Sequence, residues 1–208
     1  MDEEIKNMSH KPLIHFAHAN GVPALVYSKL FDLLKEQYDV IYTPIIGSDH
    51  RYPITNGWTC LADQVIDSIV QQAQGRKVIA LGHSLGAVLS LLASNKRPEL
   101  FEQVILLDPP LIVGKASFVM MLMKYLHPKM LDKITPAGLS AKRRDHWDSR
   151  EQAAELLRPK GFYQLFDETC FQDYIKYALT EDPRRGGVEL TISRDDEVKI
   201  LVVFQKVC

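Results

Sequence analysis

The sequence has few cysteines, almost no excess charge and no long apolar run, and each shortage excludes a class of protein. Its three cysteines, Cys60, Cys170 and Cys208, lie far apart and form no Cys-x-x-Cys pair or Cys/His cluster. A disulfide framework and a metal site are therefore not expected, and a reducing compartment, the cytoplasm, fits best. The 25 Lys and Arg residues nearly balance the 26 Asp and Glu residues, leaving a formal net charge of −1. This balance gives no electrostatic reason to bind nucleic acid or an acidic membrane surface.

Targeting and membrane-spanning segments are also missing from the pattern. Residues 1–6 are acidic and lack the apolar run of a signal peptide. The apolar stretch from Phe118 to Met123 lies between Lys115 and Lys124 and is too short to cross a bilayer. With 208 residues, 46% of them hydrophobic and 25% charged, the chain has the composition of one globular domain. We expect a soluble cytoplasmic protein.

Short apolar runs alternate with helical patterns between residues 13 and 110, the segment expected to form the core. Strands are predicted where apolar residues follow one another, and helices where they recur every three to four residues. On this basis we expect strands at 13–17, 39–42, 77–81 and 104–107, and helices from near Pro23, at 59–73 and at 85–95. Buried strands alternating with helices are typical of an α/β fold, a mostly parallel sheet flanked by helices.

The remainder of the chain has a different pattern. Residues 111–182 are predicted to be mostly helical, with capping-box spacing at Ser149–Gln152 and a single-faced helix that ends at Asp182. Residues 188–193 alternate apolar and polar side chains, and residues 199–204 are apolar. We therefore expect residues 188–208 to supply terminal strands, paired as a hairpin.

One short motif points to chemistry. Gly82-His83-Ser84-Leu85-Gly86 matches the pattern G-x-S-x-G, for which composition alone predicts roughly 0.03 accidental matches. An apolar strand precedes it and a helix rich in Ala and Leu follows it, which is the context of a nucleophile elbow. Residues two before and two after the serine approach each other in such a turn, so Gly82 and Gly86 have a steric reason to lack side chains. Ser84 is the candidate nucleophile; the alternative is a glycine-bracketed turn with an idle serine.

A nucleophilic serine also needs hydrogen-bond donors for the oxyanion that forms on the substrate. The backbone amide of Leu85, at the positive N-terminus of its helix, is one candidate. The second should come from the loop His18–Gly21, where the backbone amide of Asn20 is the best choice. An ordinary strand-to-helix turn would use Asn-Gly equally well.

These segments together resemble the α/β-hydrolase family. The strand and His-Ala-Asn-Gly loop at 13–21, the loop Asp49–Pro53, the motif 82–86 and the strand that ends at Asp108 follow the family's order. The resemblance, to small bacterial esterase-like hydrolases, covers residues 13–110 and implies that residues 111–182 form the helical cap over the active site. Ala19 stands where many members have glycine. The sequence has no G-x-G-x-x-G or Walker loop, so no nucleotide cofactor is expected.

The rest of the catalytic triad is harder to place. The family order is Ser, then Asp or Glu, then His, and after Ser84 only His127 and His146 remain, both in the cap segment. The family carries its acid and its histidine beyond the cap, so we expect the chain to lack both as it stands. Asp108 is a candidate acid in the alternative position that some relatives use, although it also suits a turn before Pro109.

His18 and His83 precede or abut the serine and are expected to be hydrogen-bonded structural residues. His146 belongs to a charged stretch, for which a solvated face is the simpler interpretation. The leading hypothesis is a serine hydrolase that cleaves an ester or related acyl bond of a small molecule through an acyl-enzyme on Ser84. The alternatives are a truncated or non-catalytic binding protein and an acyltransferase or C–C bond hydrolase, because fold does not fix reaction.

Overall fold

The structure is a computed structural model that describes residues 11–110 and 140–207. Four parallel strands form its main sheet in the order β2-β1-β3-β4. They are β1 (Leu13–Ala17), β2 (Asp39–Tyr42), β3 (Val78–His83) and β4 (Phe101–Leu107). In the middle of the sheet Ile14 pairs with Val40 on one side and Ile79 on the other. The expected parallel sheet is confirmed. The sequence could predict it because uninterrupted apolar runs are typical of strands that are covered on both faces.

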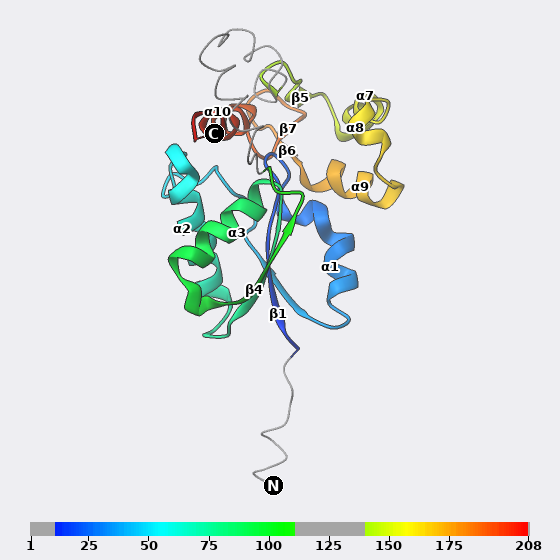
Figure 1. Ribbon diagram of the computed structural model, residues 1–208. Coiled ribbons are helices and arrows are strands. Elements are labelled where there is room, and N and C mark those ends of the chain that lie inside the picture. The colour runs from blue at the N-terminus through cyan, green and yellow to red at the C-terminus, as the bar shows by residue number, and fades with distance from the viewer. Residues whose placement is uncertain (1–10, 111–139, 208) are drawn as a thin grey trace.

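Helices cover both faces of this sheet (Figure 1). A short 3-10 turn and α1 pack on one face, while α2 and α3 pack on the other. The turn is Ala24–Tyr27, α1 is Ser28–Leu34, α2 is Thr59–Gln72 and α3 is Leu85–Lys96; two further 3-10 turns are Asn56–Trp58 and Pro98–Leu100. All three predicted helices are therefore present within a few residues of their expected bounds.

A second layer lies beyond the carboxyl ends of the strands, in the upper part of Figure 1. It contains α7 (Arg150–Leu157), α8 (Gly161–Gln164), α9 (Glu168–Tyr177) and a small antiparallel sheet, β5-β7-β6. The strands are β5 (His146–Trp147), β6 (Leu179–Glu181) and β7 (Val188–Leu190). The part of the expected cap at residues 140–182 is mostly helical, and residues 111–139 lie outside the described residues. The predicted helix before Asp182 ends earlier, at Tyr177, and β6 follows it.

The predicted capping box before α7 is present with one shift. The backbone amide of Gln152 donates to Ser149 Oγ at 3.2 Å, as the spacing predicts. The Gln152 side chain, however, accepts from the backbone amide of Asp148 at 3.0 Å. The reciprocal bond therefore falls one residue before the Ser149 cap.

The expected terminal hairpin is wrong. Residues 188–190 form β7, which pairs with β5 and β6, and the chain then continues as helix α10 (Arg194–Val207). Ser193 caps this helix, since its hydroxyl accepts from the backbone amide of Asp196 at 3.1 Å. The charged residues 194–197, which lie between the two predicted strands, form the first turn of the helix, where acidic side chains interact favourably with its positive end. Ile200 then packs into the main core, 1% exposed. Among the described residues, no helix is both long and apolar enough to span a membrane.

Candidate active site

Ser84 lies at a sharp turn between β3 and α3. Its φ of 52° and ψ of −114° place it in a backbone region that residues other than glycine rarely adopt. Its amide donates to the carbonyl oxygen of Leu107 at 2.9 Å, which ties the turn to the end of β4. A strained serine between a strand and a helix is the local geometry that the motif predicts for a nucleophile elbow.

The two motif glycines are required by close backbone contacts, but not by the same one. A Cβ at Gly82 would lie 2.3 Å from the carbonyl oxygen of Gly86, so the expected approach of the two glycines is present. A Cβ at Gly86 would instead lie 2.1 Å from the carbonyl oxygen of Ala17 and 2.8 Å from that of His18. Gly86 therefore lets the start of α3 press against the end of β1, a contact that the motif alone does not reveal.

The predicted oxyanion donors lie on the two backbone segments that this contact brings together. Leu85 is the first residue of α3, where helical amides have no partner within the helix. Asn20 lines the same cavity as Ser84, and its side-chain amide donates to the carbonyl oxygen of Glu197 at 3.0 Å. Neither backbone amide donates to another residue in the described ranges 11–110 and 140–207. Both are therefore available for a ligand, and the oxyanion-hole assignment stays a prediction.

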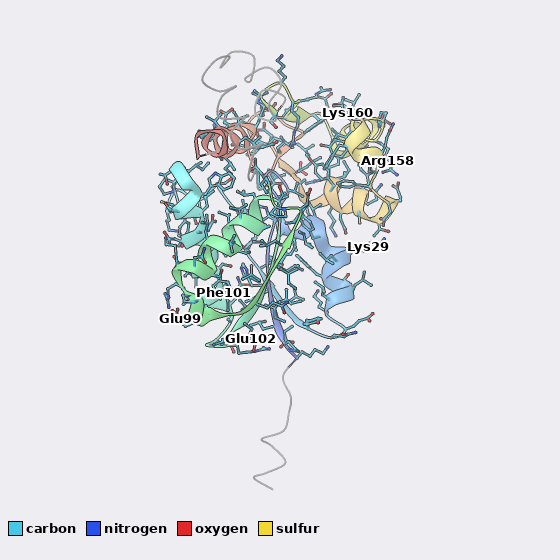
Figure 2. The ribbon with its side chains drawn as sticks, viewed as in Figure 1. Lys29, Glu99, Phe101, Glu102, Arg158 and Lys160 are labelled. Carbon is cyan, nitrogen blue, oxygen red and sulfur yellow. The ribbon has the colours of Figure 1, made fainter. Side chains whose placement is uncertain are left out.

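The cavity beside Ser84 has a volume of about 670 Å³ and is bounded by α1, the elbow, α8 and the start of α9. Lys29, labelled in Figure 2, lies on α1 at the rim and forms an ion pair with Asp167. The walls are largely apolar, formed by Val22, Val26, Leu30, Phe162, Leu165 and Phe166. A second cavity of about 630 Å³ is lined mostly by polar residues around β2 and α2 and contains none of the predicted site residues.

Asp108 lines the Ser84 cavity, and its side chain is exposed. Its φ of 45° indicates a tight turn where β4 ends, which agrees with the turn interpretation. Within the described part of the chain it makes no hydrogen bond to a histidine. The role of Asp108 as a catalytic acid stays a prediction.

His83 and His18 are both engaged in hydrogen bonds, as expected of structural residues. The Tyr27 hydroxyl lies 2.7 Å from His83 Nδ1. Burial lowers the pKa of His83, and the negative charge of Asp108 acts in the opposite direction. His18 is fully buried: its Nδ1 lies 2.8 Å from the carbonyl oxygen of Ala19, and its Nε2 accepts from the Ile46 amide at 2.8 Å. Because both ring nitrogens are engaged in these hydrogen bonds, neither is free to act as a base, and burial lowers the pKa of His18 to about 4.

Of the two downstream histidines, the structure describes only His146, which it does not bring to Ser84. His146 lies on β5, where its Nε2 is 2.7 Å from the carbonyl oxygen of Gly186, and it does not line the Ser84 cavity. It is half-buried, so the expected solvated face is only partly present. His127 lies outside the described residues. Residues 11–110 and 140–207 contain no group of three or more His, Cys, Asp or Glu side chains that could hold a metal ion.

Comparisons with known proteins agree with this architecture. The uncharacterized hydrolase YugF of Bacillus subtilis (strain 168) is 33% identical over 108 residues, which is 50% of this chain and 39% of that protein. A peroxisomal alpha-beta-hydrolase of Saccharomyces cerevisiae superposes with a TM-score of 0.66 at 16% identity, over 95% of this chain and 57% of its own. E-2-(acetamidomethylene)succinate hydrolase superposes with a TM-score of 0.65 at 19% identity, over 93% and 66% of the two chains. At such identities the two solved structures show the fold alone.

The chain thus spans less than two thirds of the length of each of these relatives. A family model described as the alpha/beta hydrolase family matches residues 16–200, which include the elbow, the Asn20 loop and the layer above the sheet. On that match, the protein belongs to the alpha/beta hydrolase family.

Proposed function

We propose that this protein is a serine hydrolase that cleaves an ester or related acyl bond of a small molecule, with Ser84 as the nucleophile. The observation that carries the proposal is the strained, half-buried Ser84 at the β3–α3 turn, facing a cavity of about 670 Å³. The name of the Bacillus relative, a hydrolase, supports the same reaction class. The free thiols of Cys60 and Cys170 agree with the cytoplasmic location that belongs to this proposal.

The reaction would proceed in two steps through a covalent intermediate. Ser84 Oγ attacks the carbonyl carbon of the substrate while its proton passes to a base, and the carbonyl oxygen becomes an oxyanion. The amides of Leu85 and Asn20 would donate to this oxyanion; one such donor typically contributes about 10²–10³ in rate. The intermediate then expels the protonated leaving group and forms the acyl-enzyme, and water releases the acid and restores Ser84.

The walls of the cavity favour an uncharged acyl group. Apolar side chains make up most of its walls, and Leu165 is 85% exposed although it is a large apolar residue. The Lys29–Asp167 ion pair at the rim leaves neither of these charges free for a charged substrate. Burying an apolar acyl chain there would contribute about 25 cal/mol per Å² of apolar surface removed from water.

A fluorophosphonate probe tests the nucleophile directly. We expect peptide mass spectrometry to place the probe on Ser84, and Ser84→Ala to abolish labelling. Ser94→Ala, which removes another half-buried serine of α3, should leave labelling unchanged. A folded chain in which Ser84 stays unmodified would contradict the proposal.

Labelling of the 208-residue chain is expected to be slow. A serine hydroxyl is a weak nucleophile without a base within hydrogen-bond reach, and no described histidine makes such a bond to Ser84 Oγ. Oxyanion donors and substrate binding alone typically accelerate the reaction roughly 10³–10⁴-fold over the rate in water. Wild type and Ser84→Ala should therefore hydrolyse activated esters at similar rates. Rapid stoichiometric labelling would contradict this expectation and assign the base to His127 or His146, with Asp108 as the acid.

The second candidate function is a non-catalytic binding protein. The hydrogen bonds of the two nearby histidines favour it, because both ring nitrogens of His18 are engaged and His83 Nδ1 lies against the Tyr27 hydroxyl. The cavity would still bind an apolar small molecule.

Product analysis separates hydrolysis from the remaining alternatives: an acyltransferase would pass the acyl group to an alcohol or amine acceptor, and a C–C bond hydrolase would cleave a ketone.

A further inference from the structure

We propose that Tyr27 is a positioning residue: its hydroxyl ties the loop that carries Asn20 to the turn that carries Ser84 and Leu85. This inference rests on the proposed function for its catalytic consequence. Two contacts of the hydroxyl oxygen carry it. The backbone amide of Ala19 donates to this oxygen at 3.4 Å, and the same oxygen lies 2.7 Å from His83 Nδ1.

The Ala19 bond has a fixed direction, and the direction of the His83 bond is assigned from the need of the phenol proton for an acceptor. The Ala19 amide can only donate, so it uses a lone pair of the Tyr27 oxygen. The single phenol proton then has one acceptor among the described residues, His83 Nδ1. We assign the phenol proton to this acceptor, an assignment that leaves His83 Nδ1 unprotonated and the ring proton on Nε2. Burial raises the pKa of Tyr27 and lowers that of His83, which agrees with a protonated phenol next to a neutral imidazole.

The tie lies where the sheet no longer holds the two segments together. β1 and β3 pair in parallel up to Ala17 and Gly82, the last partners of their ladder. His83 is the residue after Gly82, and Ala19 is the second residue after Ala17. Ala19 directly precedes Asn20, the predicted donor, and His83 directly precedes Ser84, the predicted nucleophile. Beyond the last strand pair, the Tyr27 hydroxyl thus connects the two segments by hydrogen bonds. It does so on the cavity side, since Tyr27, Ala19 and His83 all line the cavity.

The ring of Tyr27 is held independently of its hydroxyl. It packs on Phe16 with ring centroids 4.7 Å apart and lies edge-to-face on His83 at 5.8 Å. Tyr27→Phe would therefore remove the tie and keep the packing. Loss of an oxyanion donor typically costs about 10²–10³ in rate. Since Tyr27→Phe would misplace the donors without removing one, we expect a 10- to 100-fold decrease in the rate of acylation.

The test compares Tyr27→Phe with the matched variant Tyr163→Phe in the full chain. Tyr163 lies on α8 and donates to the Tyr174 hydroxyl at 3.2 Å, so Tyr163→Phe also loses a buried hydrogen bond of a tyrosine, but one that does not line the Ser84 cavity. We expect Tyr27→Phe to lower the maximal rate of fluorophosphonate labelling at Ser84 by 10- to 100-fold, with the half-saturating probe concentration unchanged. Tyr163→Phe should stay within twofold of wild type in both quantities.

Two further measurements do not depend on catalysis. Nitrogen NMR of the His83 ring should show the Nε2–H tautomer in wild type and loss of this preference in Tyr27→Phe. Amide hydrogen exchange over residues 18–21 and 83–86 should be at least 10-fold faster in Tyr27→Phe than in wild type, and unchanged in Tyr163→Phe. An Nδ1–H tautomer in wild type, unchanged exchange in Tyr27→Phe, or wild-type labelling rates with that variant would each overturn the inference. If wild type is not labelled, the proposed function fails, and the tautomer and exchange decide whether the tie exists.

Discussion

Gly86→Ala tests the elbow through a single added methyl group. A Cβ at this position would lie 2.1 Å from the Ala17 carbonyl oxygen and 2.4 Å from its carbon. Carbon and oxygen atoms that are not bonded to each other normally stay about 3.3 Å apart or more. The start of α3 and the end of β1 would therefore have to separate by about 1.2 Å.

The expected cost follows from what must move. Added methylenes in a packed core typically cost about 1–3 kcal/mol when side chains can rearrange. At Gly86 both sides of the contact are backbone, and β1 is a central strand, so we expect about 3 kcal/mol or more of lost unfolding free energy. The total free energy of unfolding of a domain of this size is about 5–15 kcal/mol. A loss of this size would lower its melting temperature by roughly 6–12 °C.

Urea unfolding followed by circular dichroism measures this loss. An unchanged dependence of the unfolding free energy on urea concentration would indicate that both proteins unfold in the same two-state manner. Gly161→Ala is the matched control, because Gly161 lies in α8 and a Cβ there meets nothing within 4 Å. We expect the control to be neutral or slightly stabilising. A Gly86→Ala protein as stable as wild type would show that the start of α3 does not pack this closely against β1, and the reasoning from the Gly86–Ala17 contact would be refuted.

Three further predictions concern other parts of the molecule. Burial lowers the pKa of His15 to about 3 and of His18 to about 4, so the unfolded chain takes up their protons first. These two histidines should therefore make the unfolding free energy fall as the pH decreases from about 7 toward 4; equal stability at pH 7.5 and 5.5 would contradict this. Glu197→Ala should cost about 2–3 kcal/mol in urea unfolding, because it leaves Arg143, 3.3 Å from Glu197 Oε2, without its buried partner; Glu197→Gln should recover part of the loss. Leu165→Ser should leave stability within 0.5 kcal/mol, since this side chain is 85% exposed, but should raise the half-saturating concentration of probes with long acyl chains and not of short ones.

The main sheet could be predicted because its signal is local. The runs at 13–17 and 39–42 are uninterrupted by turn residues, and both strands have the expected bounds. The run at 199–204 looks the same in sequence but lies in α10. What decides its conformation is distant: Ile200 packs in the main core, and its carbonyl oxygen accepts from Trp58 Nε1 at 3.2 Å, across 142 residues. A short apolar run is compatible with either conformation until its partners are known.

The residues of the candidate site also differ in whether the sequence alone could predict them. Ser84 and its glycines could be found because strand, turn and helix follow one another directly in the chain. Tyr27 could not be found, since its contacts with Ala19 and His83 span 8 and 56 residues and no motif marks them. The close backbone contact between Gly86 and Ala17 could not be predicted for the same reason. Local patterns identify a group that is shaped by its own neighbours, whereas groups that act on each other across strands need the tertiary structure.

The choice between the two large cavities follows from the order of the strands. From β1 the chain first crosses to β2 on one side, and then returns to β3 and β4 on the other, so the order β2-β1-β3-β4 reverses between β1 and β3. Loops on either side of such a reversal diverge at the carboxyl ends of the strands and leave a crevice where ligands bind. Asn20 follows β1 and Ser84 follows β3, so both lie at this point, and only the cavity of about 670 Å³ contains them. The cavity beside β2 has almost the same volume but lies away from the reversal, and the topology therefore favours the one beside Ser84.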